Sequence, residues 1–231
     1  MNILPANLRF GAGQPVKRLE DQRLLTGKGH FIDDKAGENA LWLYVLRSPH
    51  AHAKIGAIDA SAALAMPGVT AVYTGADLVA DDIGTIPTLP LFKRPDGSPM
   101  AAPPRRLLAH DVVRFAGEPV AAVLASSRAD AQTAAEAISV DYEMLPAVVN
   151  PADALAPGAP VVWPDAPDNI AAAQSYGDAA ATEAAFASAT HVVSLDLVSQ
   201  RLVPSALEPR STMAEVDKKT GRLSLHVQSQ T

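Results

Sequence analysis

The sequence predicts an α/β fold, because short strand-like runs alternate with short capped helices. Residues 41–46 (LWLYVL) form an apolar run rich in aromatic and branched side chains, typical of a strand buried on both faces. Asp59 or Ser61 then begins a helix that ends before Pro67, and a strand follows at 69–74. Hydrophobic residues make up 48% of the chain and charged residues 19%, which indicates a globular protein.

The alternation continues beyond a proline-rich loop. Prolines are frequent between residues 84 and 104 without any periodic pattern, so we expect a long ordered loop, a kind of segment that often contacts a partner. Pro119 lacks a backbone donor and is expected to begin an edge strand. The elements expected after the loop are strands at 111–115 and 119–125, a helix that Ser127 and Asp130 open and that runs to about Ile138, and a strand at 140–143.

A change of composition near residue 150 divides the chain. Residues 145–173 are rich in Pro, Ala, Asp and Asn, which is typical of an extended interdomain linker. Because a short hairpin needs neighbours to bury its second face, we expect a second domain that is incomplete here. Its expected elements are a helix at 182–188, a strand at 191–202, and a hairpin of strands at 211–216 and 222–229 that turns at Gly221.

The composition excludes several classes of function. A net charge of −6 without a concentrated basic surface argues against nucleic-acid binding. The absence of cysteine excludes disulfides, zinc–thiolate sites and cysteine-ligated iron–sulfur clusters within this chain. Residues 1–9 lack the features of a signal peptide, and Pro67 interrupts the longest uncharged run. We therefore expect a soluble, cytoplasmic protein.

No complete nucleotide, metal or catalytic motif is present. Gly11 and Gly13 lack the third glycine of a dinucleotide fingerprint, because Val16 stands in its place, so we expect plain turns. His50 and His52 would point to one side of an extended segment, but no third ligand accompanies them. We expect structural or hydrogen-bonding roles for both histidines.

Two carboxylates are the remaining candidates. Glu118 lies in the turn between two expected strands, and nothing in the sequence assigns it an acid–base role. Glu208 is expected either to pair with Arg210 or to face a cleft, and the ion pair is favoured because perturbed carboxylates need burial. Since no nucleophile elbow or carboxylate pair is found, we expect no catalytic residue, no metal ligand and no self-contained active site.

Six segments of the sequence nevertheless carry a specific pattern in a fixed order. They are residues 18–34 (RLEDQRLLTGKGHFIDD), 47–55 (RSPHAHAKI), 67–75 (PGVTAVYTG), 115–121 (FAGEPVA), 140–147 (VDYEMLPA) and 200–210 (QRLVPSALEPR). In this order they resemble the amino-terminal portion of the molybdenum-cofactor subunit of the xanthine dehydrogenase/aldehyde oxidase family, the molybdenum hydroxylases. The resemblance covers nearly the whole chain.

The resemblance implies an α/β (α+β) architecture with two parts. Residues 1–150 would form the family's hammerhead domain, a mixed sheet with helices, and residues 151–175 a linker. Residues 176–231 would be the start of a molybdopterin-binding domain that is incomplete in this sequence.

The resemblance also implies cofactors and partners. A full-length subunit of the family binds a molybdenum pyranopterin, while partner subunits or domains carry 2Fe–2S clusters and FAD. The expected partners are the remainder of the molybdenum subunit, an iron–sulfur subunit and an FAD subunit. The family hydroxylates aldehydes, N-heterocycles or related small substrates with water as the oxygen source, and a glutamate serves as the base. That glutamate and most pterin-binding loops lie beyond the position that matches Thr231.

Five residues are candidates for a site in this chain. Gln230 is the candidate cofactor contact, and Gln200, Glu208, Arg210 and Glu118 are candidates for a substrate channel or an interface. Arg210 follows Pro209 where carbon monoxide-oxidising members tend to have Thr-Cys, which favours aldehyde or heterocycle oxidation. The alternative hypothesis is a non-catalytic assembly or binding protein that retains the hammerhead fold.

Overall fold

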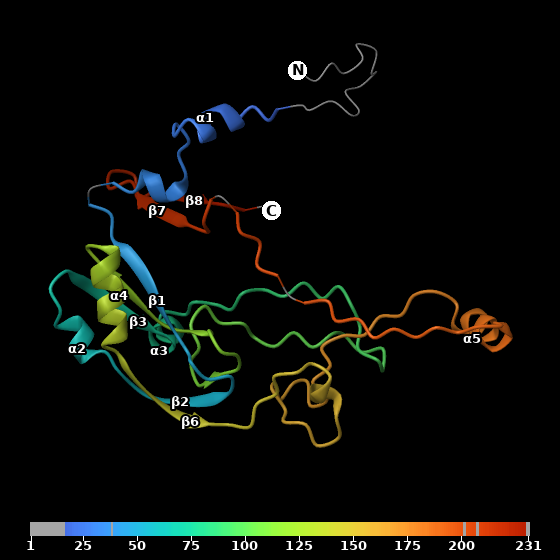
Figure 1. Ribbon diagram of the computed structural model, residues 1–231. Helices are drawn as coiled ribbons and strands as arrows, with labels where there is room; N and C mark the ends of the chain where they lie inside the picture. Colours follow the sequence, from blue (N-terminus) through green and yellow to red (C-terminus); the bar gives the residue numbers. More distant parts are fainter. Residues whose placement is uncertain (1–16, 38, 201, 207, 230–231) are drawn as a thin grey trace, which may run out of the picture. The chain divides into compact units, whose positions relative to one another are not determined.

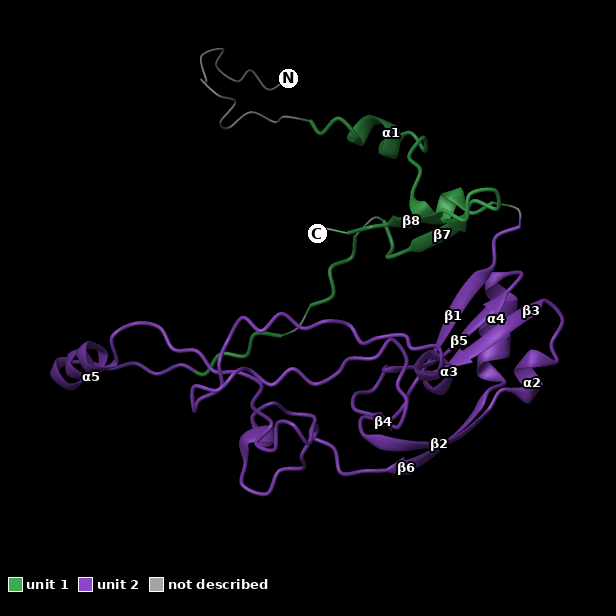
Figure 2. Cartoon of the chain, turned by 180° about the vertical axis from the view of Figure 1, so that it is seen from behind, with its two compact units in different colours: residues 1–38, 196–231 green, residues 39–195 purple. Residues whose placement is uncertain are grey.

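The chain divides into two compact units. The computed structural model describes residues 17–37, 39–200, 202–206 and 208–229. The larger unit consists of residues 39–195, and the smaller unit combines residues 1–38 with residues 196–231 (Figure 2).

The first sheet of the larger unit is built around a central strand. β5 (Pro119–Ala125) pairs antiparallel with β1 (Trp42–Arg47) on one side and with β3 (Val69–Thr74) on the other. The prediction of an edge strand at Pro119 is therefore wrong. Pro119 is the first residue of β5, a position at which a missing backbone donor is tolerated in a sheet. The prediction that residues 41–46 are buried on both faces is also wrong, because the Leu43 side chain is 58% exposed.

Two helices cover this sheet with small side chains. α4 (Arg128–Glu136) contacts β1, β5 and β3, and α2 (Ser61–Leu64) contacts β3 and α4 (Figure 1). The expected cap is confirmed, because the Ser127 hydroxyl accepts a hydrogen bond from the Asp130 backbone N–H at 3.1 Å. Alanines let a helix approach a sheet closely, and the core of fully buried residues is Ala63, Ala121, Val123, Ala134 and Ala135.

A second sheet lies in the same unit. β2 (Ala53–Asp59) is its middle strand, between β4 (Val112–Val113) and β6 (Ser139–Met144), and both pairings are antiparallel. Ile58 and Val140 pack against the buried residues of both sheets and so join the two cores. The α+β class is confirmed, and all strand pairs in the described part of the chain run antiparallel.

The smaller unit contains the expected hairpin. β7 (Thr212–Val216) pairs antiparallel with β8 (Leu223–Val227), and Gly221 in the turn has a φ of 70°. That backbone conformation is costly for residues with a Cβ, so the role predicted for Gly221 is confirmed. The unit also contains α1 (Asp21–Leu25) and the short 3₁₀ helix η2 (Ile32–Lys35), which contacts β7.

The strand predicted at 191–202 is wrong for the described residues of that range, which form neither helix nor strand. Their apolar side chains remain in solvent, with Val193 89% and Leu197 82% exposed. A strand needs a hydrogen-bonded neighbour, and the described residues supply none to this segment. The preceding helix α5 (Ala179–Ser188) is confirmed, although it buries no residue. None of the helices within the described ranges is both long enough and apolar enough to cross a membrane.

The segment predicted as an extended linker is folded against the larger unit. Asn169, with a φ of 58°, organises it: the side-chain oxygen accepts a hydrogen bond from the Val162 N–H at 3.0 Å, while the side-chain nitrogen donates to the carbonyls of Ala154 and Pro160. The short 3₁₀ helix η3 (Asp153–Leu155) lies within the same segment. These internal hydrogen bonds explain why a proline-rich stretch adopts one folded conformation.

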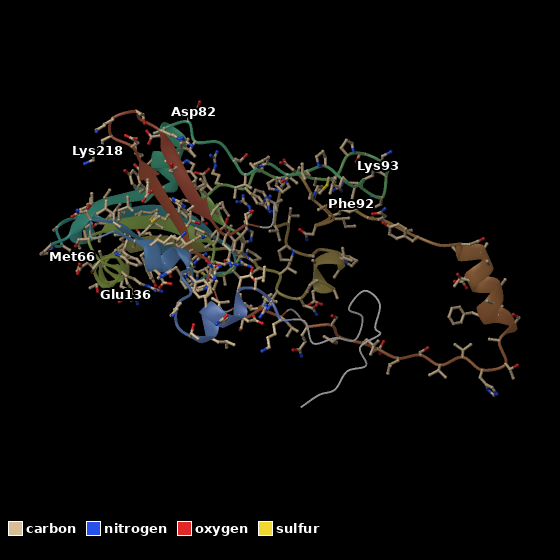
Figure 3. All side chains as sticks on the ribbon, turned by 90° about the horizontal axis from the view of Figure 1, so that it is seen from above. Met66, Asp82, Phe92, Lys93, Glu136 and Lys218 are labelled. Carbon is tan, nitrogen blue, oxygen red and sulfur yellow. The ribbon has the colours of Figure 1, made fainter. Side chains whose placement is uncertain are left out.

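Arg94 fixes this segment to the proline-rich loop of residues 84–104. Its guanidinium donates two hydrogen bonds of 2.7 Å to the Asp168 carboxylate and a third to the carbonyl of Ile170. The neighbouring Lys93 carbonyl accepts a hydrogen bond from Ala173. Figure 3 labels Lys93 beside Phe92 on this loop. A loop lacking strands of its own thus holds the supposed linker in place.

The helix α3 (Gly75–Ala80) provides a test of close packing. A Cβ on Gly75 would overlap the carbonyl oxygen of Ala109 and lie 2.8 Å from the His110 Cα. We expect Gly75→Ala to lower the free energy of unfolding by about 2 kcal/mol, because backbone must move. Gly84→Ala is the matched control, since a Cβ there meets open space. Equal effects of the two substitutions in urea denaturation would contradict this close approach.

The Asn169 hydrogen bonds predict a second effect on stability. Asn169→Ala leaves two carbonyls and one N–H of the segment without their partner, so we expect a loss of about 2 kcal/mol and faster proteolysis between residues 153 and 170. Asn150→Ala removes the exposed hydrogen bond that the Asn150 side-chain oxygen accepts from the Ala152 N–H, and it serves as the control. If proteolysis accelerates no more in Asn169→Ala than in the control, Asn169 does not organise this segment.

The Arg94–Asp168 contact predicts a dependence on pH. The hydrogen bonds from Arg94 hold the pKa of Asp168 below its ordinary value of 3.8. A carboxylate with a depressed native pKa stabilises the fold above its unfolded pKa, and this contribution is lost as the pH falls through the native pKa. Asp168→Asn should therefore destabilise the protein at pH 7 and show a shrinking effect below about pH 4. Urea denaturation between pH 3 and 7 measures the difference in the free energy of unfolding between the variant and the parent protein, with Asp165→Asn as the control. A difference that does not change with pH would refute the stabilising role of the Asp168 carboxylate.

Candidate functional site

Glu208 links two parts of the smaller unit. Its half-buried carboxylate accepts a hydrogen bond from the Gln228 side-chain amide at 3.2 Å and another from the Ile32 backbone N–H at 3.4 Å. The expected ion pair with Arg210 is wrong, because the described residues form none between them. Glu208 therefore connects the end of the hairpin to η2 through uncharged donors.

Arg210 lies on an open depression of the smaller unit. Its guanidinium is exposed, and hydroxyl and amide groups share the surface with it. The lining residues are Pro204, Arg210, Ser211, Thr212, Gln228 and Ser229. A set of hydrogen-bond donors with one positive charge suits an acceptor-rich or anionic ligand.

Gln200 does not join this depression in the described structure. Gln200 is exposed in the segment without secondary structure, and it is not among the residues that line the depression. Gln230, the candidate cofactor contact, lies outside the described residues.

Glu118 closes a turn in the larger unit. Its carboxylate accepts a hydrogen bond of 2.5 Å from the Arg114 backbone N–H, and its carbonyl accepts one of 2.9 Å from the Ser48 N–H. Both contacts fix the connection between β4 and β5. The carboxylate therefore serves the local fold, and a role in a channel or an interface stays a prediction.

Arg114 ties this turn to the folded segment. Its guanidinium carbon lies 3.7 Å from the centroid of the Trp163 ring, and its Nε donates to the Val162 carbonyl at 3.2 Å. Burial lowers the pKa of Arg114, while the nearby carboxylates of Glu118 and Asp111 partly offset this effect. A guanidinium stacked on an indole is a favourable contact in both packing and charge.

A cavity of about 300 Å³ lies beside Trp163 in the larger unit. Its lining contains no ionisable side chain, and the amide of Asn169 is occupied by backbone groups. The lining residues are Ala101, Pro103, Val148, Val149, Asn150, Pro151, Ala154, Val162, Trp163, Ala166, Asn169 and Ala171. Such a lining offers no acid, base or nucleophile.

The histidines have the local roles expected of them. His52 Nδ1 lies 2.7 Å from the Pro146 carbonyl and acts as a donor to it, and the ring of His50 packs edge-on against Tyr142 with centroids 4.8 Å apart. No group of His, Cys, Asp and Glu side chains that could hold a metal ion occurs among the described residues.

Three residues with structural importance escaped the sequence analysis. Arg94, Arg114 and Asn169 each contact groups brought close only by folding; Arg94 and Asp168 are 74 residues apart. The Asp168-Asn169 pair within a proline-rich stretch is a local signal of a turn that relies on side-chain hydrogen bonds.

Two family models match consecutive parts of the chain. The model described as aldehyde oxidase and xanthine dehydrogenase, a/b hammerhead domain, matches residues 26–146. The model described as molybdopterin cofactor-binding domain matches residues 162–231. The second match includes both Trp163 and the depression beside Arg210.

Curated proteins and solved structures agree with these matches. The carbon monoxide dehydrogenase large chain of Afipia carboxidovorans is 38% identical over 93% of this chain, and the nicotine 6-hydroxylase large subunit of Paenarthrobacter nicotinovorans is 38% identical over 98%. The chain spans 27% of the length of each. A structure of reconstituted CO dehydrogenase from Oligotropha carboxidovorans superposes with a TM-score of 0.76 at 38% identity, covering 92% of this chain and 27% of that one. The chain therefore belongs to the aldehyde oxidase and xanthine dehydrogenase family.

Proposed function

We propose that this chain is part of a molybdenum hydroxylase that oxidises an aldehyde, an N-heterocycle or a related small substrate with water as the oxygen source. It supplies the hammerhead scaffold and one part of the cofactor-binding domain. The observation that carries this proposal is the match of the molybdopterin cofactor-binding domain to residues 162–231, after the hammerhead match to residues 26–146. The relatives named above are all enzymes, which favours this proposal over a non-catalytic assembly protein.

The proposed domain organisation keeps three parts. Residues 1–150 form the hammerhead domain, 151–175 the connection, and 176–231 the start of the molybdopterin-binding domain. The family matches support this order, since the hammerhead match ends at residue 146 and the molybdopterin match begins at residue 162. The contacts of Arg94 and Arg114 add that the connection packs on the larger unit.

The residues of the smaller unit suit a pyranopterin. Arg210, Thr212 and Ser211 present donors on one depression, and a pterin with its phosphate presents acceptors. We propose that these groups, together with Gln230, hold the cofactor, and that Gln200 and Glu208 lie at a channel or interface. When bound, the cofactor supplies the redox centre of the reaction, while this chain contributes binding and orientation.

The proposed partners follow from the missing redox groups. Residues 1–231 contain no cysteine and cannot ligate an iron–sulfur cluster through thiolates, so such clusters would be held outside these residues. We propose an iron–sulfur subunit and an FAD subunit as partners, in the cytoplasm.

Isolation of the protein from its source tests this function. We expect molybdenum and a pterin released by oxidation to co-purify with the protein, and oxygen from ¹⁸O-labelled water to enter an aldehyde or N-heterocycle product. Gln230→Ala should lower the bound molybdenum about tenfold, because a lost ligand-orienting contact weakens metal-site affinity to this extent. Gln132→Ala, on the exposed side of α4, is the control. A preparation that contains neither molybdenum nor pterin would overturn the proposal.

A further inference from the structure

The Glu208 carboxylate is shared between two donors that lie far apart in the sequence. Its Oε1 accepts a hydrogen bond of 3.4 Å from the Ile32 N–H, and its Oε2 accepts one of 3.2 Å from the Gln228 side-chain nitrogen. Ile32 is the first residue of η2, and the first N–H groups of a helix have no partner within that helix. One oxygen of Glu208 is thus held by η2, while the other holds Gln228.

The contact with Glu208 determines which end of the Gln228 amide faces the carboxylate. A side-chain amide has a nitrogen that donates and an oxygen that accepts, whereas a carboxylate only accepts. The nitrogen therefore lies against Glu208, and the oxygen remains for another group. Without such a neighbour, rotation about the last side-chain bond would exchange the two ends of this exposed amide.

Gln228 belongs to the depression that also presents Arg210. A guanidinium only donates hydrogen bonds, and the hydroxyls of Ser211 and Thr212 donate or accept. The Gln228 oxygen adds an acceptor to this surface. A pterin ring carries N–H donors as well as acceptors, so a fixed acceptor suits it better than an amide that presents either end. Glu208 is not among the lining residues, so its effect on a ligand passes through Gln228.

We propose that Glu208 is a positioning residue for the pyranopterin, because it holds the Gln228 amide with the oxygen available to an N–H donor of the cofactor. The inference rests on the proposed function, since it takes the cofactor as the ligand of the depression. Gln228 thereby becomes a cofactor contact alongside Arg210. Glu208 needs no contact with cofactor or substrate for this role.

The amino-terminal segment takes part in the same arrangement. Ile32 lies within the hammerhead match, whereas Glu208 and Gln228 lie within the molybdopterin match. The smaller unit nevertheless contains all three residues, and η2 contacts β7 in it. A segment that precedes the hammerhead strands therefore supports the cofactor site through Glu208.

Glu208→Gln separates positioning from a purely structural connection. The new side chain keeps the size of the carboxylate but has one oxygen and one nitrogen. The Ile32 N–H is part of the backbone and cannot turn, so it takes the new oxygen. The new nitrogen then faces Gln228, whose amide turns and offers its own oxygen to position 208. Both hydrogen bonds survive, but Gln228 now presents its nitrogen to the depression.

The cofactor content of the protein purified from its source tests the proposal. We expect Glu208→Gln to unfold at the urea concentration of the parent protein but to retain about tenfold less molybdenum and pterin per polypeptide, as for other lost orienting contacts. Gln228→Ala should show the same loss, and the double variant no further loss, because Glu208 acts through Gln228. Glu215→Gln, beside His226 on the same hairpin, is the matched control and should keep the parent content.

The other outcomes overturn the proposal. Parent-like cofactor content in Glu208→Gln or in Gln228→Ala, additive losses in the double variant, or an equal loss in Glu215→Gln each remove the positioning role. If Glu208→Gln lowers the urea midpoint, the double variant decides: a loss no greater than that of Gln228→Ala supports the role, and a greater loss removes it. A parent protein without molybdenum and pterin removes the proposed function and this inference with it. Parent content with an unaffected Glu208→Gln variant removes only the role of Glu208.

Discussion

The structure depends on the burial of β5 on both of its faces. Val123 and Ala121 on one side pack under α4, while Val120 on the other side joins Ala53 and Val113 of the second core. Each buried aliphatic side chain contributes to a continuous apolar interior, and the two cores meet at Ile58. The Pro119 carbonyl of β5 also accepts a hydrogen bond from the Ala109 N–H. The same strand therefore positions the loop whose Ala109 lies against Gly75.

Local sequence patterns correctly predicted the strands, caps and turns that depend on residues close together in the sequence. The strand at 69–74, the Ser127 cap and the Gly221 turn are all specified by residues close in sequence. β2 was not predicted from the sequence, because Gly56 interrupts the alternation of apolar and polar residues along it. The strand predicted at 191–202 is wrong because a strand needs a neighbouring strand to pair with, which an apolar pattern alone does not supply. The same limit applies to the site: Glu208 meets Ile32 across 176 residues, a contact that only the fold creates.

The chemistry of this chain is consistent with a scaffold. Its cavity beside Trp163 has no ionisable lining, Glu118 is used in a turn, and Glu208 is used between η2 and the hairpin. Arg210 is exposed and lines the open depression of the smaller unit. Binding and positioning are therefore what these residues offer.

The folded segment around Asn169 also determines where the gene can be divided. The molybdopterin match begins at residue 162, yet Val162, Trp163 and Asp168 are bound by Arg114 and Arg94 of the larger unit. An expression fragment cut at the match boundary would remove the partners that both guanidinium groups have in this segment, together with part of the cavity wall, including Trp163 and Asn169. Modular exchange between family members should therefore place its junction after residue 173, where this network of contacts ends.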